Sequence, residues 1–424
     1  MPTIAVKTLG CKVNQYDTEA MLELLEKDGY ESVPFEEDAD VYLVNTCTVT
    51  GTGDAKSLKL IRRLHREHPS SAIVAAGCLA QFSAQKVHLD GVVLAIGVQR
   101  RGEVASLLKQ ALETHSFIDA TGSLKNAPFE KLNVSRHEGK TRATMKIQEG
   151  CDRYCSYCVI PYVRGPVRSM DLSDVRAEAV RLAEAGYKEI VLTGIHLASY
   201  GRDTGSSLLD AVREVCACVP RVRLGSLEPL SASEEFAKGL SELEGVCPQF
   251  HLSLQSGSDS VLKRMNRRYG TDEYLAACEN LRKYFPGCAI TTDVIAGFPG
   301  ETEEEFEETC AFVEKASLAR LHVFPYSRRS GTAADRLPDQ IGEDVKKRRA
   351  EKLIEIGNRL ELCYVKRSVG SCQSVLFETA DADGYAEGHS KTYLRVRAKG
   401  TPGEINEVLI TGTDGKLCTA EILK

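Results

Sequence analysis

The sequence predicts an α/β fold, because short apolar runs typical of strands alternate with stretches of helical periodicity over most of the chain. Four such runs lie between residues 3 and 96, and six more lie between residues 143 and 324. From residue 368 the pattern changes to short strands separated by glycine-containing turns, which is typical of a small β-barrel. We therefore expect two α/β domains followed by a β-barrel.

The domain boundaries follow from these changes of pattern. The expected segments are an N-terminal parallel-sheet α/β domain at 1–115, an interdomain linker at 116–140, a central partial (β/α)6 barrel at 141–340, a connector helix at 341–365 and a small β-barrel at 366–424. The linker contains Gly, Pro, Asn and Ser without periodicity. The connector carries apolar residues at helical spacing, namely Leu353, Ile356 and Leu360.

The composition indicates a globular protein without an overall basic field. Hydrophobic residues make up 42% of the chain and the formal net charge is -6, so any contact with nucleic acid has to come from local patches. The chain has 15 cysteines but neither a signal peptide nor an apolar run of membrane length, which favours metal-binding thiols over a disulfide framework. We expect a cytoplasmic protein that contacts no membrane.

Three cysteines stand at the ends of predicted strands in the N-terminal domain: Cys11, Cys47 and Cys78, here called the strand-end triad. In an open parallel sheet the carboxyl ends of the strands form the ligand-binding edge. Taken singly, each cysteine is better explained as a buried packing residue. Taken together, their equivalent positions predict a site in which three thiolates hold an iron-sulfur cluster and leave one iron open.

A second group, Cys151, Cys155 and Cys158, forms a Cys-x-x-x-Cys-x-x-Cys loop, here called the loop triad. A structural zinc site needs four ligands, whereas three thiolates on a cubane cluster leave one iron free for a substrate or cofactor. The loop has no fourth ligand nearby, so we favour a cluster over zinc or chance packing. Tyr157, inside the loop, would place an aromatic ring where it could pack on an adenine.

The two triads and the terminal barrel resemble the methylthiotransferase family of radical S-adenosylmethionine enzymes over the whole chain. The resemblance implies an auxiliary 4Fe-4S cluster on the strand-end triad, a radical-generating 4Fe-4S cluster on the loop triad, and a TRAM-type barrel that holds substrate. In that family, one S-adenosylmethionine methylates a sulfur at the auxiliary cluster. A second is cleaved to a radical, which the unactivated C-H bond at carbon 2 of adenine requires.

The resemblance also implies a set of residues that bind S-adenosylmethionine near the loop triad. They are Tyr157, Arg168, Gly194, Glu228, Gln255 and Asp293. Several stand in loops after strands, where Gly and Pro are also ordinary turn residues. One departure from the family pattern concerns its basic run, because Pro166, Val167 and Met170 leave Arg164 and Arg168 to contact the cofactor or RNA.

Residues 10–19, 194–197 and 265–268 resemble the subgroup that modifies threonylcarbamoyladenosine next to the anticodon. This implies a tRNA anticodon stem-loop as substrate and a flavodoxin or ferredoxin as reductant. The alternatives within the chemistry are isopentenyladenosine in tRNA and a ribosomal-protein aspartate. An alternative from another class is a non-catalytic metal-cluster protein that binds RNA.

Clusters of cations are expected to hold RNA phosphates. They lie at Arg267 and Arg268, at Arg328 and Arg329, and in the run from Lys346 to Arg349. The remaining cysteines are expected to be packing residues; they are Cys216, Cys218, Cys247, Cys278, Cys288, Cys310, Cys363, Cys372 and Cys418.

Overall fold

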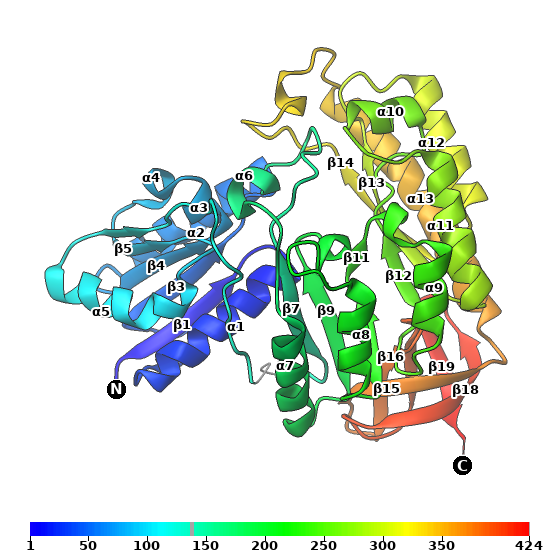
Figure 1. Cartoon of the computed structure of the whole chain (residues 1–424), viewed down its shortest axis with the longest axis horizontal. Coiled ribbons are helices and arrows are strands. Elements are labelled where there is room, and N and C mark those ends of the chain that lie inside the picture. Colours follow the sequence, from blue (N-terminus) through cyan, green and yellow to red (C-terminus); the bar gives the residue numbers. More distant parts are fainter. Residues whose placement is uncertain (136–139, 424) are drawn as a thin grey trace.

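The computed structural model describes residues 1–135 and 140–423. In Figure 1 the N-terminal domain lies at the left, the partial barrel in the centre and right, and the C-terminal β-barrel below the partial barrel. The two chain ends lie at opposite sides of the molecule. Helix α1 lies between the N-terminal sheet and the first barrel strand, so it borders both α/β domains.

The N-terminal domain is a six-stranded parallel sheet in the order β2-β1-β3-β4-β5-β6. Its elements are β1 (Thr3–Thr8), α1 (Lys12–Lys27), β2 (Glu31–Ser32), β3 (Val41–Thr46), α2 (Gly51–Glu67), β4 (Ala72–Gly77), α3 (Cys78–Phe82), α4 (Ala84–Val87), β5 (Val92–Ile96), η1 (Arg101–Glu103), α5 (Val104–Thr114) and β6 (Ile118–Ala120). Apolar clusters cover both faces, as parallel sheets require, and every residue of β3 is buried.

The predicted strand over 92–96 is confirmed, and the strand predicted to reach Cys11 ends earlier, at Thr8. Cys11 is instead the residue that caps α1, and Cys78 is the first residue of α3. The segment expected to be an interdomain linker without periodic structure contributes the edge strand β6, which pairs with β5. Its three residues are too short a run to produce a periodic pattern in the sequence.

The central domain is a partial barrel made of two four-stranded sheets, β10-β9-β7-β8 and β11-β12-β13-β14. The strands are β7 (Ala143–Glu149), β8 (Arg168–Ser169), β9 (Glu189–Gly194), β10 (Arg221–Leu224), β11 (Ser226–Leu227), β12 (Gln249–Leu252), β13 (Ala289–Ala296) and β14 (Arg320–Pro325). The helices are α6 (Ile160–Arg164), α7 (Leu172–Glu184), η2 (Leu197–Ser199), α8 (Leu208–Cys216), η3 (Pro229–Ser231), α9 (Glu234–Ser241), α10 (Asp259–Arg264), α11 (Thr271–Tyr284), α12 (Glu303–Lys315) and η4 (Ala334–Arg336).

The two faces of the partial barrel differ in polarity. Ile290 and Val294 of β13 belong to the large apolar cluster that the surrounding helices cover. Between them in sequence, Thr291 and Asp293 point to the opposite face and contact His251 of β12. The barrel interior is therefore polar and available for a charged ligand.

The C-terminal part begins with α13 (Glu343–Arg367), which packs along β14, and continues into a closed five-stranded barrel in the order β15-β16-β17-β19-β18. Its strands are β15 (Cys372–Ala380), β16 (Tyr385–Ser390), β17 (Arg395–Lys399), β18 (Ile405–Thr413) and β19 (Leu417–Ile422). The sequence did not indicate β16. Arg223 of the partial barrel donates hydrogen bonds to Lys391 O and Ser390 O of this barrel, which fixes the two domains together.

Candidate active site: two cysteine triads joined by a buried ionic network

The strand-end triad lies at the carboxyl edge of the N-terminal sheet, where Cys11 follows β1, Cys47 follows β3 and Cys78 follows β4. Burial raises the pKa of the Cys47 and Cys78 thiols, and the nearby Cys11 is among the smaller causes of both shifts. Gly10 makes this approach possible: its φ is +105°, and a Cβ there would lie 3.0 Å from Cys47 Cβ and 3.1 Å from Cys47 Sγ. Asn14 braces the site by donating hydrogen bonds to Leu9 O (2.8 Å) and Thr46 O (3.0 Å).

Cys78 is the buried member of this triad, and its thiol faces a cation from the central domain. Arg164 donates through Nε to Cys78 Sγ at 3.3 Å. Burial raises the pKa of the Cys78 thiol to about 11, while the Arg164 charge opposes this shift. A metal has to displace the thiol proton when it binds, and the guanidinium favours the resulting thiolate.

The loop triad is shaped by backbone contacts with the segment that follows it. Cys151 donates its N–H to Gly165 O (3.0 Å) and Cys158 donates its N–H to Cys155 O (2.9 Å). Gly150, with φ +74°, passes so close to this segment that an added Cβ would lie 1.7 Å from Pro166 O. Burial raises the pKa of Cys151 to about 11 and that of Cys158 to about 12.

Arg267 is a site residue whose role the sequence reasoning missed. It was expected to bind RNA phosphates, but it donates through Nη1 to Cys155 Sγ at 3.1 Å and through Nε to Tyr269 Oη at 2.8 Å. Its position between Met265 and Tyr269 leaves it half-buried beside the loop. The residues 265–268 already carried the family resemblance, and this was the signal that could have assigned Arg267 to the site.

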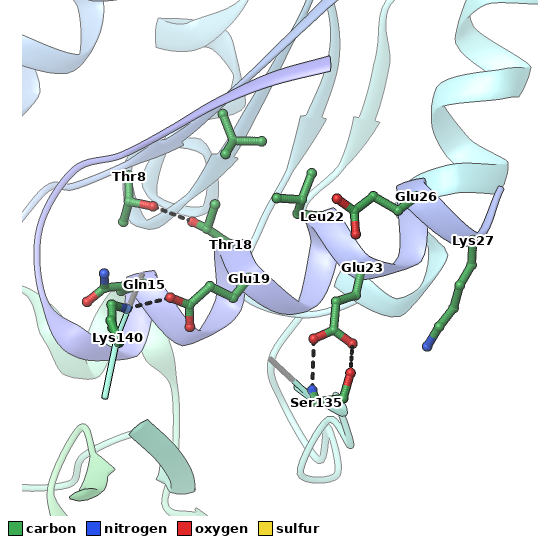
Figure 2. A pocket seen from close by; sticks show the side chains of 11 residues that line it. Thr8, Gln15, Thr18, Glu19, Leu22, Glu23, Glu26, Lys27, Ser135 and Lys140 are labelled. Atoms are coloured by element: carbon green, nitrogen blue, oxygen red, sulfur yellow. Dashed lines mark hydrogen bonds and ion pairs between the residues drawn. The ribbon is translucent and has the colours of Figure 1, made fainter. Parts of the chain in front are cut away.

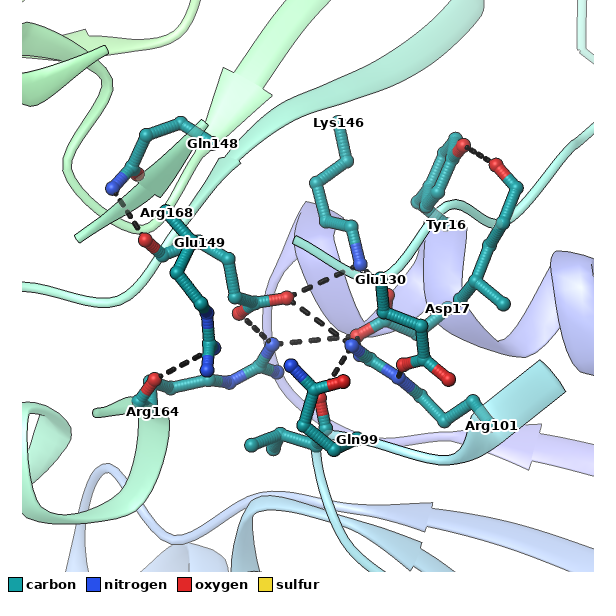
Figure 3. A network of polar contacts seen from close by, with 12 residues as sticks. Tyr16, Asp17, Gln99, Arg101, Glu130, Lys146, Gln148, Glu149, Arg164 and Arg168 are labelled. Carbon is teal, nitrogen blue, oxygen red and sulfur yellow. Dashed lines mark hydrogen bonds and ion pairs between the residues drawn. The ribbon is translucent and has the colours of Figure 1, made fainter. Parts of the chain in front are cut away.

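A buried ionic network crosses the boundary between the N-terminal and central domains, and Figure 3 shows its side chains. Its cations are Arg101, Lys146, Arg164 and Arg168, and its carboxylates are Asp17, Glu130 and Glu149. Burial alone would raise the pKa of Glu149, but Arg164, Lys146 and Arg101 hold it well below its usual value. Glu149 directly precedes the loop triad, and Arg164 touches Cys78, so the network fixes one triad relative to the other.

Two of the predicted cofactor-binding residues, Glu228 and Tyr157, lie against the loop. The buried Glu228 accepts a hydrogen bond from Arg153, inside the loop, and lies 3.6 Å from His196 Nε2. The Tyr157 ring packs edge-on against Phe298, with 6.4 Å between ring centroids. Glu228 thus holds the loop through Arg153, whereas Tyr157 anchors it to the apolar cluster around Phe298.

Gly194, Gln255 and Asp293 come from both sheets of the partial barrel: Gly194 from β9 in one, Asp293 from β13 in the other, and Gln255 from the segment that follows β12. Gly194 ends β9, where a Cβ would lie 2.8 Å from Gln148 Cβ. Gln255 has φ +72° and donates its N–H to Asp293 O at 2.8 Å. The Asp293 carboxylate lies 3.3 Å from His251 Nε2 in the barrel interior. These positions are compatible with a ligand at the strand ends, and their cofactor role stays a prediction.

Arg168 lies deeper than a residue that reaches RNA. It is 3% exposed, donates through Nη2 to Arg164 O at 2.9 Å, and leaves Nε and Nη1 without a partner. Arg164 is fully buried. Both arginines belong to the ionic network, so the expectation that they contact RNA does not fit their burial.

Several cations expected to hold phosphates are also buried. Arg329 pairs with Asp54 at 2.8 Å, and Arg349 pairs with Glu301 at 2.8 Å. Lys346 and Arg349 lie three residues apart on α13 and share its inner face, whereas Lys347 and Arg348 face solvent. The prediction for the whole cation set is therefore wrong for Arg329, Lys346 and Arg349.

The other cysteines fit the packing prediction in part. Cys247, Cys278, Cys288, Cys310 and Cys418 are buried, but Cys363 and Cys372 are exposed. The exposed thiols lie on the outer sides of α13 and β15, where the sequence pattern did not distinguish inner from outer positions.

Each triad offers the donor set that holds a 4Fe-4S cluster, because it consists of three free thiols and a guanidinium donates a hydrogen bond to one sulfur of each triad. A cubane places each thiolate on a different iron, which separates the sulfurs. The ionic network has four cations against three carboxylates, and this excess positive charge suits a cluster made negative by three thiolates.

In the part of the chain that the structure describes, no helix combines the length and the apolar character that crossing a membrane requires.

Family models match two parts of the chain. Residues 145–313 match the radical SAM superfamily, and residues 3–97 match an uncharacterized protein family, UPF0004. The structure is similar to that of the radical S-adenosylmethionine methyltransferase TsrM from Kitasatospora setae. The TM-score is 0.57 at 14% identity, covering 88% of this chain and 77% of that one. At this identity the likeness concerns the fold alone.

Curated relatives match nearly the whole chain. The threonylcarbamoyladenosine tRNA methylthiotransferase MtaB of Bacillus subtilis is 40% identical over 96% of this chain and 93% of its own, and that of Thermotoga maritima is 35% identical over 97% and 94%. The tRNA-2-methylthio-N(6)-dimethylallyladenosine synthase of Pelotomaculum thermopropionicum is 33% identical over 97% and 96%. Identity of this level across all three domains, with both triads in place, shows that this chain belongs to the radical S-adenosylmethionine methylthiotransferase family.

Proposed function

We propose that this protein adds a methylthio group to carbon 2 of N6-threonylcarbamoyladenosine next to the anticodon of tRNA. The observation that carries the proposal is the 40% identity to a threonylcarbamoyladenosine tRNA methylthiotransferase over 96% of the chain. The identity to a dimethylallyladenosine synthase is lower, at 33% over a similar share. Isopentenyladenosine in tRNA is therefore the second candidate substrate, and a ribosomal-protein aspartate is the third.

Six cysteines would hold the cofactors that this chemistry needs. Cys11, Cys47 and Cys78 would hold an auxiliary 4Fe-4S cluster, and Cys151, Cys155 and Cys158 a second one that binds S-adenosylmethionine. When bound, these groups supply the electron, the radical and the sulfur that an unactivated C-H bond requires. The support is the converging thiols, the arginine donors at Cys78 and Cys155, and the net positive network between them.

The protein's own side chains hold the two sites and the substrate in place. Arg153 and Glu228 tie the loop triad to the end of β11, and Arg267 holds Cys155 by donating a hydrogen bond to its sulfur. The network around Glu149 and Arg164 fixes the separation between the two triads, which has to match one adenine. A base next to the anticodon would be splayed out of its stack to enter between them.

A flavodoxin or ferredoxin is the proposed electron donor, and a tRNA substrate would place the enzyme in the cytoplasm. Cations that face solvent, such as Arg268, Arg328, Lys347 and Arg348, would contact RNA phosphates.

The test compares three substrates with the anaerobically reconstituted enzyme. They are tRNA bearing threonylcarbamoyladenosine, the same tRNA bearing isopentenyladenosine, and an aspartate-containing ribosomal protein, each followed by mass spectrometry. We expect the methylthio product from the first substrate alone. If only one of the other two substrates is methylthiolated, the proposed substrate is wrong, whereas the family assignment still holds.

A further inference from the structure

A cavity of about 260 Å³ lies where the three domains meet. Lys12 and Gln15 of α1 line it from the N-terminal domain, and Thr144 and Val191 line it from the first strands of the partial barrel. Tyr393 closes it from the C-terminal barrel. A ligand in this cavity would touch every domain of the protein.

Two cations in this cavity are available to a ligand to different degrees. Lys12 forms no ion pair within residues 1–135 and 140–423. Arg142 forms an ion pair through Nη2 with Glu378, at 3.1 Å. Its Nη1 lies 3.9 Å from Glu189, which is beyond hydrogen-bond distance. The unpaired lysine is therefore the strongest feature of the cavity.

A third cation at the cavity, Lys140, is already occupied. It forms an ion pair with Glu19 of α1, and Figure 2 shows its side chain turned toward that carboxylate. This pair borders a second cavity of about 600 Å³ along α1, where Glu19, Glu23 and Glu26 outnumber the cations Lys27 and Lys140. The Lys12 cavity has the opposite balance, with Lys12, Lys140 and Arg142 against Glu378, so it is the more favourable of the two for an anionic ligand.

Positive charge gathers around the Tyr393 ring at this cavity. Lys12, whose side chain is exposed, and Arg142 both line the cavity beside Tyr393. The guanidinium groups of Arg142 and Arg223 lie 5.3 Å and 4.7 Å from the centroid of the Tyr393 ring. A single carboxylate between Lys12 and Arg142 would be attracted by both.

We propose that this cavity is the subsite for the carboxylate of the modified base, with Lys12 as the main contact and Arg142 as the second. The proposal rests on the proposed function, because a threonylcarbamoyl group carries a carboxylate and an isopentenyl group carries none. Lys12 and Arg142 then act as specificity-determining residues that distinguish these two bases.

The position of the cavity agrees with this role. Lys12 directly follows Cys11 of the strand-end triad, and Thr144 lies on β7, the strand that leads to the loop triad. A base held beside the strand-end triad would therefore have Lys12 close to its N6 substituent. The non-polar parts of Val191 and the threonines provide contact for the rest of that substituent.

The experiment measures the affinity of the iron-loaded enzyme for an anticodon stem-loop RNA with threonylcarbamoyladenosine, with isopentenyladenosine or with plain adenosine at the same position. All three RNAs carry the same phosphates, so the difference between them isolates the substituent. We expect Lys12→Met to weaken binding of the first RNA by about ten- to hundredfold and to leave the other two unchanged. Lys12→Arg should retain most of the preference.

The matched control is Lys109→Met on α5, which removes one exposed charge far from the cavity and should change nothing. Equal weakening of all three RNAs by Lys12→Met would show a phosphate contact and overturn the proposal, as would no change. If Lys12→Met lowers the iron content because it disturbs the neighbouring Cys11, the Arg142→Gln variant is measured instead. Weaker binding of the threonylcarbamoyladenosine RNA alone would support the subsite, and an unchanged preference for that RNA would overturn it. A wild-type enzyme without preference for the first RNA would refute the proposed function instead.

Discussion

The two cysteine triads are built in opposite ways. The loop triad spans residues 151–158 and is local in sequence, whereas the strand-end triad gathers cysteines from positions 11, 47 and 78. The sheet edge holds the strand-end triad in place. The loop triad depends on the residues that pack against it, including Pro166 and Arg267. A local motif thus needs external support for its shape, and a dispersed one obtains its shape from the fold.

A cation assists each triad, but it comes from a different place. Arg267 reaches Cys155 from within the partial barrel, and Arg164 crosses the domain boundary to reach Cys78. The strand-end triad is therefore completed by the central domain. This predicts that the N-terminal domain alone would lack one hydrogen bond to its cluster.

The largest effect should come from removing one triad at a time. Replacing Cys151, Cys155 and Cys158 with Ala should abolish cleavage of S-adenosylmethionine and leave about half of the iron, because each triad holds one cubane. Replacing Cys11, Cys47 and Cys78 should also halve the iron and abolish methylthiolation, yet leave that cleavage working. Iron analysis and detection of 5′-deoxyadenosine measure both outcomes. Loss of all iron in either variant would show that the triads are not independent.

A smaller effect should come from the glycine beside each triad. Gly150→Ala would place a Cβ 1.7 Å from Pro166 O, a backbone atom, and should destabilise the protein by about 3 kcal/mol. Gly10→Ala meets Cys47 Cβ at 3.0 Å, a contact that a shift of a few tenths of an ångström relieves, and should cost about 1 to 2 kcal/mol, chiefly from its φ of +105°. Urea unfolding of the two variants gives the comparison. Gly205→Ala, whose Cβ would meet nothing within 4 Å at φ +76°, controls for backbone strain alone.

The smallest effect should come from replacing the two arginines that donate hydrogen bonds to the cysteine sulfurs. Arg164→Lys and Arg267→Lys keep the charge but lose the planar donor to sulfur, so each should lower the midpoint potential of its own cluster by roughly 60 mV. Hydrogen bonds to ligand sulfurs stabilise the more negative, reduced state. Redox titration followed by electron paramagnetic resonance resolves the two clusters. If the midpoint potentials of both clusters shift in the Arg164 variant, the two clusters interact electrostatically through the ionic network.

The sequence by itself determined the fold class, both triads and the family. Alternating strand and helix patterns are local, because each apolar run and each helical stretch is read from a few consecutive residues. The cysteine spacing at 151–158 is likewise a property of the chain alone. These features can be predicted without knowing which distant segments contact one another.

Only the tertiary structure decided which cations serve the site and which face solvent. Arg164, Arg168 and Arg267 look like surface cations in the sequence, but carboxylates and thiols from distant segments enclose them. Lys12 is exposed, but the residues that line its cavity come from all three domains, which only the fold brings together. Charge pairing is a long-range property, because a buried ion is stable only where the fold brings an opposite charge or a ligand to it.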